Sequence, residues 1–366
     1  MRKPFRTDNV FEVEDDAAWD ALVAVCPQGE VFHTTAWLRL LEEVFGVRAE
    51  RLGLVHGGEL VAGWPLLLRR VGPFRTLGSP FFNVVTPQMG PVWRDPALLA
   101  GLLAGFEGYQ RWAGIAYCEV TFAAALAGEG LAGLGYRQDA YRTLVLYLEG
   151  RTEEDLWKGC EGRARTAVRK AQRLGVEVET AADLSFLPEY MGMAEAVYAR
   201  HRHRAPIPLD FYRALWACFW PGGNLQVLLA RHESRVVAAG VFLGHGQRLY
   251  YLDGVSRPEG YRLGANNLLQ WQVIRWAREE GYEVYDMMGA GIPEIARFKR
   301  SFGSHLVELP VVRRTNSLPA TAGLAVYRGF RPLARALAFR GAALRRREAV
   351  AFRTDGPHRI REGGRT

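Results

Sequence analysis

Lysine is scarce in this 366-residue chain. Of its 47 basic residues only four are lysines, namely Lys3, Lys158, Lys170 and Lys299. Arginine is therefore the usual basic residue of this chain, and the four lysine positions are exceptions. Because the two side chains differ in shape and hydration, such a position is a candidate for a specific role.

Negative charge is also in short supply, with 39 acidic residues and a net charge of +8. The excess is uneven, because from Arg314 to the C-terminal end twelve arginines face only Glu348, Asp355 and Glu362. Residues 1–313 are consequently close to neutral. A nucleic-acid-binding surface over the whole protein is not indicated, because the positive charge is confined to the tail.

Cysteines are few and widely separated. They are Cys26, Cys118, Cys160 and Cys218, with no C-x-x-C pair. This spacing argues against a disulfide framework and a cysteine metal site, and it indicates a reducing compartment. No stretch approaches the roughly 20 apolar residues of a membrane span, and the N-terminal segment has no apolar signal-peptide core. We expect a cytoplasmic protein.

Several catalytic motifs are missing as well. The sequence has no G-x-S-x-G elbow, no P-loop and no cluster of His, Asp and Glu with metal-ligand spacing. Serine-hydrolase, P-loop NTPase and metal-dependent chemistry are therefore not indicated. We expect neither a metal nor a bound cofactor.

What is present is an alternation of helical and strand hydrophobic periods, typical of α/β (α+β) proteins with a mixed sheet flanked by helices. Helices are predicted at 15–25, 35–45, 97–113, 152–174, 186–203, 209–219, 264–280 and 293–301. Strands are predicted at 49–55, 59–69, 115–122, 143–149, 176–180, 225–231, 235–243, 248–254, 282–288 and 305–312.

The order of elements occurs twice. The segments RLGLVHGGELVAGWPLLL and VLLARHESRVVAAGVFLG are both a strand, a polar turn and a strand, with Ala62 and Ala239 each followed by glycine at matching places. Repetition of a strand–turn–strand unit within the same order of elements indicates a duplicated domain. We predict an N-terminal domain at 1–150 and a C-terminal domain at 151–313 that carries the active cleft.

The remaining residues, 314–366, form a basic Arg-rich tail. Within it, residues 318–350 have apolar and arginine side chains at roughly helical spacing. A basic amphipathic helix is typical of contact with an anionic membrane surface or an acidic partner. The alternative is a partly disordered tail with the general arginine bias of the chain.

One loop indicates anion binding. A predicted strand ending near Asp253 leads through a Gly/Pro-containing loop into a long helix that begins near Gly264, and helix N-termini favour anions. This layout resembles the acyl-CoA loop of GNAT enzymes, where an Arg/Gln-x-x-Gly-x-Gly/Ala run binds the CoA pyrophosphate. Here the run reads Tyr261-x-x-Gly264-x-Asn266, so Asn266 brings a side chain to a position where the backbone would approach phosphate.

A second resemblance covers most of 151–312. The run N-N-L-L from Asn266, then G-Y-x-x-Y-D ending at Asp286, then F-K-x-x-F-G from Phe298, is similar to the C-terminal half of Fem-type peptidyltransferases. The basic helix containing Arg165, Arg169 and Lys170 resembles the opening of that family's second domain. The resemblance implies two tandem GNAT-like domains with the substrate cleft at the second, and it implies that Asn266 contacts substrate. The long helical hairpin of some members has no counterpart.

Lys299 is the first catalytic candidate, because it matches the family's lysine. Attack of an amine on an ester carbonyl develops an oxyanion, which a fixed cation can stabilise. Phe298 and Phe302, four residues apart, are expected to bury one face of this helix, to hold the ammonium group and to line the substrate site. The alternative is a surface lysine whose stem covers apolar area.

Three further residues are predicted near the cleft. Asp286 lies near the end of a predicted buried strand, where it is either the general base or a carboxylate that caps the following glycine-rich turn. Tyr251 and Asp253 are placed by strand alternation on one face, where they line the cleft or belong to the core.

Two arginine-rich segments are predicted to contact phosphate. Tyr198 and Arg202 close a helix in a segment that resembles the family's diphosphate-contacting region, and an arginine there is suited to bidentate phosphate binding. Arg165, Arg169 and Lys170 would meet an anionic partner such as the tRNA acceptor stem. The alternative for both segments is a solvated basic helix.

The resemblance to Fem-type enzymes implies an acyltransferase that moves an amino acid from aminoacyl-tRNA to an amine on a nucleotide- or lipid-linked peptidoglycan precursor. The alternative is an acyl-CoA-dependent GNAT N-acyltransferase that acts on an amino sugar, a polysaccharide precursor or a small amine. The expected location is the cytoplasm, with peripheral contact at the inner membrane face through 318–350 as a further expectation.

Overall fold

The computed structural model describes residues 4–7, 9–81, 84–122, 135–200 and 207–316. The chain separates into one unit at Met1–Arg314 and another at Thr315–Thr366, and only the start of the second is described. The tail segment 318–350 and Arg202 lie outside the described residues. Within the described residues, no helix combines the length and apolar character needed to cross a membrane.

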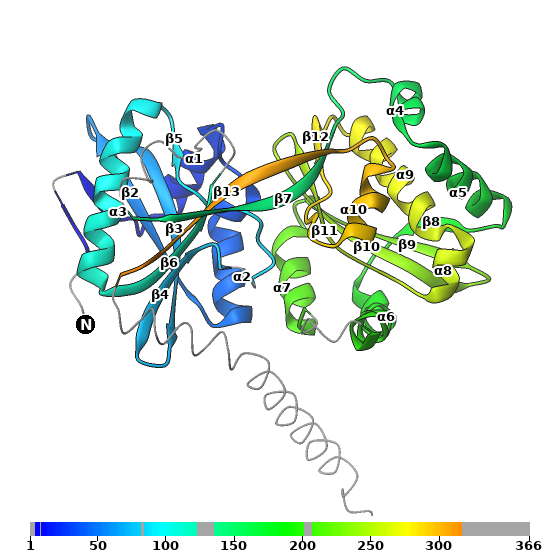
Figure 1. Ribbon diagram of the computed structural model, residues 1–366, viewed down its shortest axis with the longest axis horizontal. Coiled ribbons are helices and arrows are strands. Elements are labelled where there is room, and N and C mark those ends of the chain that lie inside the picture. Colours follow the sequence, from blue (N-terminus) through cyan, green and yellow to red (C-terminus); the bar gives the residue numbers. More distant parts are fainter. Residues whose placement is uncertain (1–3, 8, 82–83, 123–134, 201–206, 317–366) are drawn as a thin grey trace, which may run out of the picture. The chain divides into compact units, whose positions relative to one another are not determined.

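The first half of the chain, up to residue 150, contains three α-helices and seven strands among the described residues (Figure 1). The helices are α1 (Asp16–Val25), α2 (Thr35–Phe45) and α3 (Leu99–Ala113), with short 3₁₀ helices η1 (Val31–His33) and η2 (Pro96–Leu98). The strands are β1 (Val10–Glu12), β2 (Arg48–His56), β3 (Glu59–Val71), β4 (Phe74–Ser79), β5 (Val92–Trp93), β6 (Ile115–Thr121) and β7 (Arg137–Tyr147).

The second half, residues 151–314, repeats the alternation of helices and strands. Its helices are α4 (Glu153–Gly159), α5 (Gly162–Arg173), α6 (Leu187–Arg200), α7 (Leu209–Phe219), α8 (Pro258–Leu263), α9 (Ala265–Glu279) and α10 (Pro293–Arg300), with a 3₁₀ helix η5 (Leu184–Phe186). Its strands are β8 (Glu177–Thr180), β9 (Leu225–His232), β10 (Arg235–His245), β11 (Arg248–Ser256), β12 (Val284–Asp286) and β13 (His305–Thr315).

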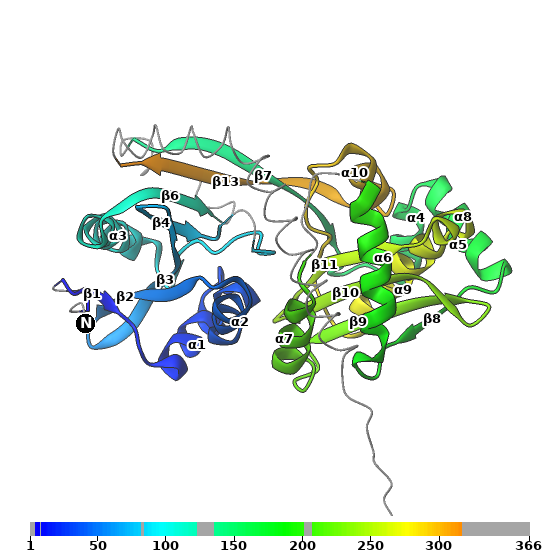
Figure 2. The same ribbon diagram turned by 90° about the horizontal axis from the view of Figure 1, so that it is seen from below.

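One mixed sheet joins the two halves in the order β1-β2-β3-β4-β6-β13-β7-β12-β11-β10-β9-β8. Its centre is a long antiparallel pair, β7 and β13, which run side by side in Figures 1 and 2. Strand β7 also pairs with β12 through its last residues, and β13 lies beside β6. The sheet is therefore continuous across residue 150, and the domain boundary there stays a prediction.

Most predicted elements are present, and the predicted α/β architecture is confirmed. The matching hairpins are β2–β3 and β9–β10, both antiparallel. The single helix predicted at 152–174 is wrong, because α4 ends at Gly159 and α5 begins at Gly162. The break lets the Glu161 N–H donate to the Ser301 carbonyl at 2.8 Å, which ties α4 and α5 to the end of α10.

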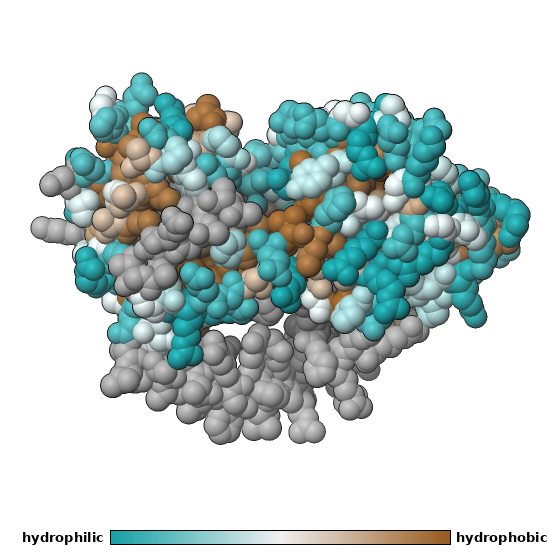
Figure 3. All heavy atoms as spheres, turned by 45° about the horizontal axis from the view of Figure 1, so that its top comes forward, coloured by the Kyte–Doolittle hydropathy of each residue, from teal (hydrophilic) through white to brown (hydrophobic). Residues whose placement is uncertain are grey.

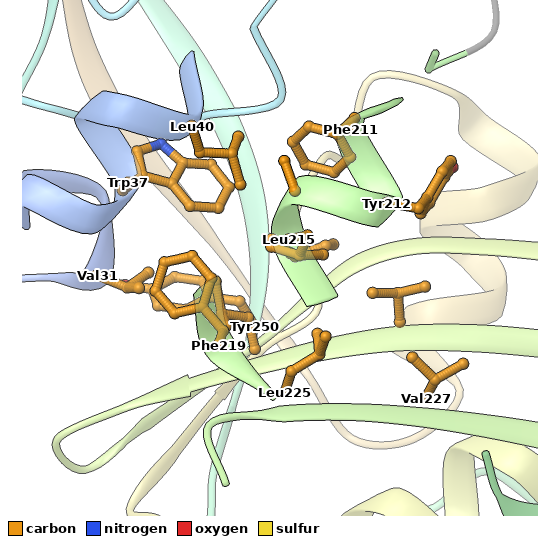
Figure 4. Packing of buried hydrophobic residues seen from close by; sticks show 14 of the residues in the cluster. Val31, Trp37, Leu40, Phe211, Tyr212, Leu215, Phe219, Leu225, Val227 and Tyr250 are labelled. Carbon is orange, nitrogen blue, oxygen red and sulfur yellow. The ribbon is translucent and has the colours of Figure 1, made fainter. Parts of the chain in front are cut away.

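A hydrophobic core lies where α2 of the first half contacts α7 of the second. Trp37 on α2 faces Phe211 and Leu215 on α7 in Figure 4. Trp37 is fully buried and lies edge-on to Phe211, with ring centroids 6.2 Å apart. Replacing a large buried aromatic side chain with alanine usually lowers the free energy of unfolding by about 3–5 kcal/mol. This contact therefore helps to hold the two halves together.

A second core lies between α5, α9 and the sheet of the second half. Helix α5 buries Ala164, Val168 and Ala171, which recur at intervals of four and three residues and form one apolar stripe. The small alanine side chains let the backbone of α5 come close to the start of α9. That close contact positions the basic helix relative to the candidate site.

Candidate active site

The site begins where two parallel strands separate. Strands β11 and β12 are paired only from Arg248 opposite Val284 to Tyr250 opposite Asp286. Strand β12 ends there, whereas β11 continues to Ser256. The ends of neighbouring parallel strands are where α/β sheets place their ligands. The candidate catalytic side chains among the described residues lie at this point.

Lys299 lies at this separation and is buried, with 7% of its surface exposed. It comes from the inner face of α10, and its Nζ donates to the carbonyls of Met288 at 2.8 Å and Gly289 at 3.0 Å. Its ammonium group also lies 5.8 Å from the centre of the Tyr251 ring, within cation–π range. Lys299 is therefore not a surface lysine, and its catalytic role stays a prediction.

The two phenylalanines beside Lys299 pack as expected from their spacing. Phe302 is buried in the second core, and Phe298 packs partly buried against the same core. Their rings meet edge-on with centroids 5.4 Å apart. They anchor α10 at the position from which Lys299 reaches the turn after β12. Contact with substrate stays a prediction for both.

Asp286 lies at the end of β12 and is buried. Its Oδ1 accepts hydrogen bonds from the Thr143 hydroxyl and from the Met288 N–H, the latter at 2.8 Å. The carboxylate therefore caps the turn that Lys299 holds from the other side, as in one of the two predicted roles. Burial raises the pKa of Asp286, although the Thr143 hydrogen bond and the Arg248 charge act in the opposite direction. Its role as a general base is a prediction that this geometry leaves open.

A charge network connects Asp286 to the first half of the chain. Arg248 places Nη1 3.9 Å from Asp286 Oδ2 and Nε 3.1 Å from Glu30 Oε1. Glu30 also accepts a hydrogen bond from the Tyr250 hydroxyl. Burial raises the pKa of Glu30 to about 7, although Arg248 and Tyr250 lower it. Two buried carboxylates thus share one guanidinium group.

Three residues of this network, Glu30, Arg248 and Tyr250, were not predicted as site residues from the sequence. Glu30 precedes a three-residue 3₁₀ helix, too short to give a periodic signal, and 220 residues separate it from its partner Tyr250. The only local signal is His33, whose Nδ1 accepts from the Glu30 N–H at 3.1 Å. His33 Nε2 therefore carries the proton and donates to Gly90 O at 3.0 Å. Burial lowers the pKa of His33 to about 4, so it is neutral at physiological pH.

Tyr251 and Asp253 do not share a face, so that prediction is wrong. Strand β11 has a bulge at Leu252, since Val241 pairs with Asp253 and the next residue, Phe242, pairs with Tyr251. The extra residue shifts the alternation by one position. Tyr251 consequently stacks on Phe242 in the second core, with ring centroids 5.2 Å apart, whereas Asp253 points toward α6 and α7.

The other predicted substrate contacts are less defined. Asn266 lies half-buried in the first turn of α9. Tyr198 belongs to α6, but its side chain and the whole of Arg202 lie outside the described residues. The structure therefore brings together Lys299, Asp286, Tyr251, Phe298 and Phe302, and it leaves the predicted diphosphate contact as a prediction.

The three predicted phosphate-binding residues of α5 have contacts within the protein. Arg165 donates to three carbonyls at the end of α4, including Lys158 O at 3.1 Å, and Arg169 lies 5.4 Å above the Trp157 ring. Lys170 donates to Arg262 O at 2.8 Å at the end of α8. Arg169 and Lys170 remain exposed. The right-hand side of the molecule, where Figure 1 labels α5, is largely hydrophilic in Figure 3.

Helix α5 also covers the start of α9. Gly264 ends α8 and begins α9 with φ +79°, and a Cβ added there would lie 2.6 Å from the Ala167 carbonyl oxygen. The Ala167 carbonyl and the Lys170 side chain, which contacts Arg262, therefore both lie against the junction of α8 and α9. This junction corresponds to the loop that resembles the pyrophosphate-binding loop of GNAT enzymes. The expected long helix at 264–280 is likewise preceded by a separate helix, α8, rather than by a loop.

We expect Gly264→Ala to destabilise the protein more than Gly175→Ala. Both glycines have left-handed backbones, φ +79° and +74°, but nothing lies within 4 Å of a Cβ at Gly175. The control should lose about 1–2 kcal/mol from backbone strain. Gly264→Ala should lose about 2–4 kcal/mol, because a clash with Ala167 adds to that strain. Urea unfolding measures both, and equal losses would show that α5 does not press on the junction.

Two surface hollows of the described residues lie elsewhere. One, of about 320 Å³, is lined by residues such as Phe74, Arg75 and Trp112, and the other, of about 590 Å³, by residues such as Glu177, Glu179 and Arg231. Neither is lined by Lys299 or Asp286. The candidate site is therefore defined by the strand separation and its buried charges.

The segment that contains the candidate site is similar to a known protein family. The model of a family described as "Acetyltransferase (GNAT) domain" matches residues 159–300, which include β11, β12 and Lys299. This segment is therefore similar to GNAT acyltransferase domains. A comparison with curated protein sequences gives no significant match.

Solved structures extend the likeness of this GNAT domain to the whole fold. FemX matches with a TM-score of 0.66 and 15% identity, covering 85% of this chain and 97% of that chain. L-PGS from Bacillus licheniformis matches with a TM-score of 0.54 and 14% identity, covering 87% and 98%. A tandem GNAT protein from the clavulanic acid biosynthesis pathway matches with a TM-score of 0.52 and 13% identity, covering 84% and 98%. The predicted tandem GNAT-like, Fem-like fold is confirmed.

Proposed function

We propose that this protein is an aminoacyltransferase that moves an amino acid from aminoacyl-tRNA to an amine on a peptidoglycan precursor peptide. The acyltransferase class is supported by the GNAT domain at residues 159–300. The choice of aminoacyl donor and peptide acceptor is supported by the fold shared with FemX and by the F-K-x-x-F-G element that contains Lys299.

The observation that carries the choice of donor is the contact between α5 and Gly264. In GNAT enzymes a helix start of this kind binds the CoA pyrophosphate through backbone N–H groups, which requires an open approach. Here the Ala167 carbonyl lies against Gly264, and Lys170 binds the preceding carbonyl of Arg262. A diphosphate placed against this side of Gly264 would have to displace α5, which is anchored by its buried stripe of Ala164 and Val168.

The proposed reaction needs one bond to form and one to break. The acceptor amine attacks the ester carbonyl of the aminoacyl group, and an amide bond forms as the bond to the tRNA hydroxyl breaks. The departing hydroxyl takes up a proton, and a proton leaves the amine nitrogen. No redox change or cofactor is needed.

Lys299 is the group that we assign to the developing oxyanion. Met288 O and Gly289 O hold its ammonium group at the strand separation, and in the proposed reaction the ester carbonyl binds beside it. A preorganised donor of this kind contributes roughly 3–4 kcal/mol to transition-state stabilisation. Asp286 holds the same turn through Met288 N–H and thereby helps to position the lysine.

The alternative is an acyl-CoA-dependent N-acyltransferase that acts on an amino sugar, a polysaccharide precursor or a small amine. It is favoured by the family match, which is to an acetyltransferase domain, and by the likeness to a tandem GNAT protein. It requires the junction at Gly264 to open, or a CoA site elsewhere in the chain.

The donor can be tested by binding. We expect uncharged and aminoacylated tRNA to bind with strong salt dependence, and coenzyme A not to compete. Replacing both Arg169 and Arg173, exposed on α5, with glutamine should weaken tRNA binding and reduce the log–log salt slope by about one per lost phosphate contact. Arg213→Gln on α7, paired with Asp210 at 3.5 Å, is the control and should leave the slope unchanged. Tight binding of coenzyme A without binding of tRNA would favour the alternative.

A further inference from the structure

The carboxylate of Asp253 has no role in the proposed reaction, but its position is unusual. It lies on β11 beyond the last residue paired with β12, and the bulge at Leu252 turns it toward α6 and α7. Bulges are frequent next to active sites because they redirect a side chain. The next residue, Gly254, is exposed and has no side chain, and the Tyr251 hydroxyl fills the space where a Cβ would lie. Asp253 therefore lies at the open end of the strand separation.

Two tyrosines hold the Asp253 carboxylate by the same oxygen. The hydroxyl of Tyr190 on α6 donates to Oδ2 at 2.6 Å, and that of Tyr212 on α7 donates to Oδ2 at 2.5 Å. Lengths of about 2.5–2.7 Å are those of hydroxyl groups that donate to an ionised carboxylate. Tyr190 and Tyr212 are both buried, so they fix the orientation of the carboxylate.

The other oxygen, Oδ1, is free to meet a ligand. Among the described residues, no lysine, arginine or histidine lies within 4.0 Å of the Asp253 carboxylate, and Oδ1 accepts no hydrogen bond. Asp253 is only partly exposed. A partly buried charge is normally paired, and an ionised carboxylate has room for about two further donors on its second oxygen.

The surroundings suit a compact cation. The rings of Tyr190 and Tyr212, whose hydroxyls hold the carboxylate, meet edge-on with centroids 5.1 Å apart. A primary ammonium group carries three donors on a small charged centre, so it matches one free carboxylate oxygen with aromatic neighbours.

We propose that Asp253, held by Tyr190 and Tyr212, binds the primary ammonium group of a substrate. The identity of that substrate rests on the proposed function, which supplies two sources with the same chemistry. One is the α-ammonium group of the aminoacyl donor, and the other is the amine of the acceptor before it loses its proton.

A small probe tests the site without any turnover. Saturation-transfer NMR with the full chain compares n-pentylammonium chloride with 1-pentanol at about millimolar concentration. The wild-type protein should bind the ammonium probe at least about tenfold better, as expected for a charge-assisted hydrogen bond. Asp253→Asn, which keeps the shape and accepts both tyrosine hydroxyls, should remove that preference. Asp210→Asn, exposed on α7, is the control and should keep it.

The source of the ammonium group is then identified by calorimetry with two stable pairs. One pair is an acceptor peptide with a free or an acetylated amine, and the other is an amide-linked aminoacyl-adenosine with a free or an acetylated α-amine. The pair whose preference for the free amine disappears in Asp253→Asn identifies the source. A probe preference that depends on Asp253, with neither pair bound, would support the ammonium site and contradict the proposed function. A wild-type protein without preference, or an Asp253→Asn protein that keeps it, would overturn the ammonium site itself.

Discussion

Lys299→Met should lower kcat for acyl transfer by about 100- to 1000-fold, with a smaller change in KM. The reason is that the lysine cation acts on charge that develops only in the transition state, so its loss affects turnover more than substrate binding. Methionine has a similar length but cannot donate to Met288 O and Gly289 O. A stability loss of about 1–3 kcal/mol should accompany the change.

Two companion variants separate catalysis from folding. Lys158→Met removes an exposed lysine paired with Glu154 at 2.7 Å and should leave kcat and the unfolding midpoint unchanged. Lys299→Arg keeps a cation and should retain more activity than Lys299→Met at comparable stability. If Lys299→Met is folded by near-UV circular dichroism and transfers at the wild-type rate, Lys299 is structural only.

Arg248→Met should lower the free energy of unfolding by about 3–5 kcal/mol, the usual loss when one partner of a buried ion pair is removed. The change leaves the buried carboxylates of Glu30 and Asp286 without the guanidinium group that lies beside both. Adding Glu30→Gln removes one of these charges and should recover part of the loss. Denaturant unfolding of the single and double variants measures the coupling.

The loss in Arg248→Met should be larger at about pH 8 than at about pH 5. Burial raises the pKa of Glu30 from its ordinary 4.5 to about 7, and Arg248 lowers it, so the variant should have a still higher value. A carboxyl whose pKa is higher in the folded state contributes stability that falls as pH rises from the unfolded to the folded pKa.

A second buried group, His33, also makes the stability of both proteins depend on pH. His33, with its pKa lowered to about 4, contributes in the opposite sense between about pH 4 and 6.5. That contribution is common to wild type and variant and cancels in their difference. A difference independent of pH would mean that Glu30 is not the group that Arg248 neutralises.

Periodicity was sufficient to predict the framework of this fold, because most helices and strands have one buried face. The helix at 35–45 and the hairpin at 49–69 correspond to α2, β2 and β3. Lys299 could also be selected from the sequence as a candidate catalytic residue. Lysine is rare in this arginine-rich chain, and this one lies in the F-K-x-x-F-G element.

The remainder depends on contacts between distant segments. The bulge at Leu252 moves Asp253 to the opposite face, and the alternation of residues along β11 carries no sign of it. The break after α4 at Gly159 frees the Glu161 N–H to donate to the Ser301 carbonyl, far along the chain. Glu30 reaches the site only because the sheet and the α2–α7 contact bring the two halves together.

The most direct test of the central claim is a donor competition with the purified full-length chain and a peptidoglycan precursor peptide as acceptor. One reaction contains a mixture of aminoacyl-tRNAs and the other a panel of acyl-CoAs, and the mass of the acceptor is measured in each. We predict a gain of one amino-acid residue from the tRNA mixture, abolished by prior treatment with RNase and strongly reduced in Lys299→Met. A gain from acyl-CoA alone would contradict the account and would show that the junction at Gly264 opens to bind a pyrophosphate.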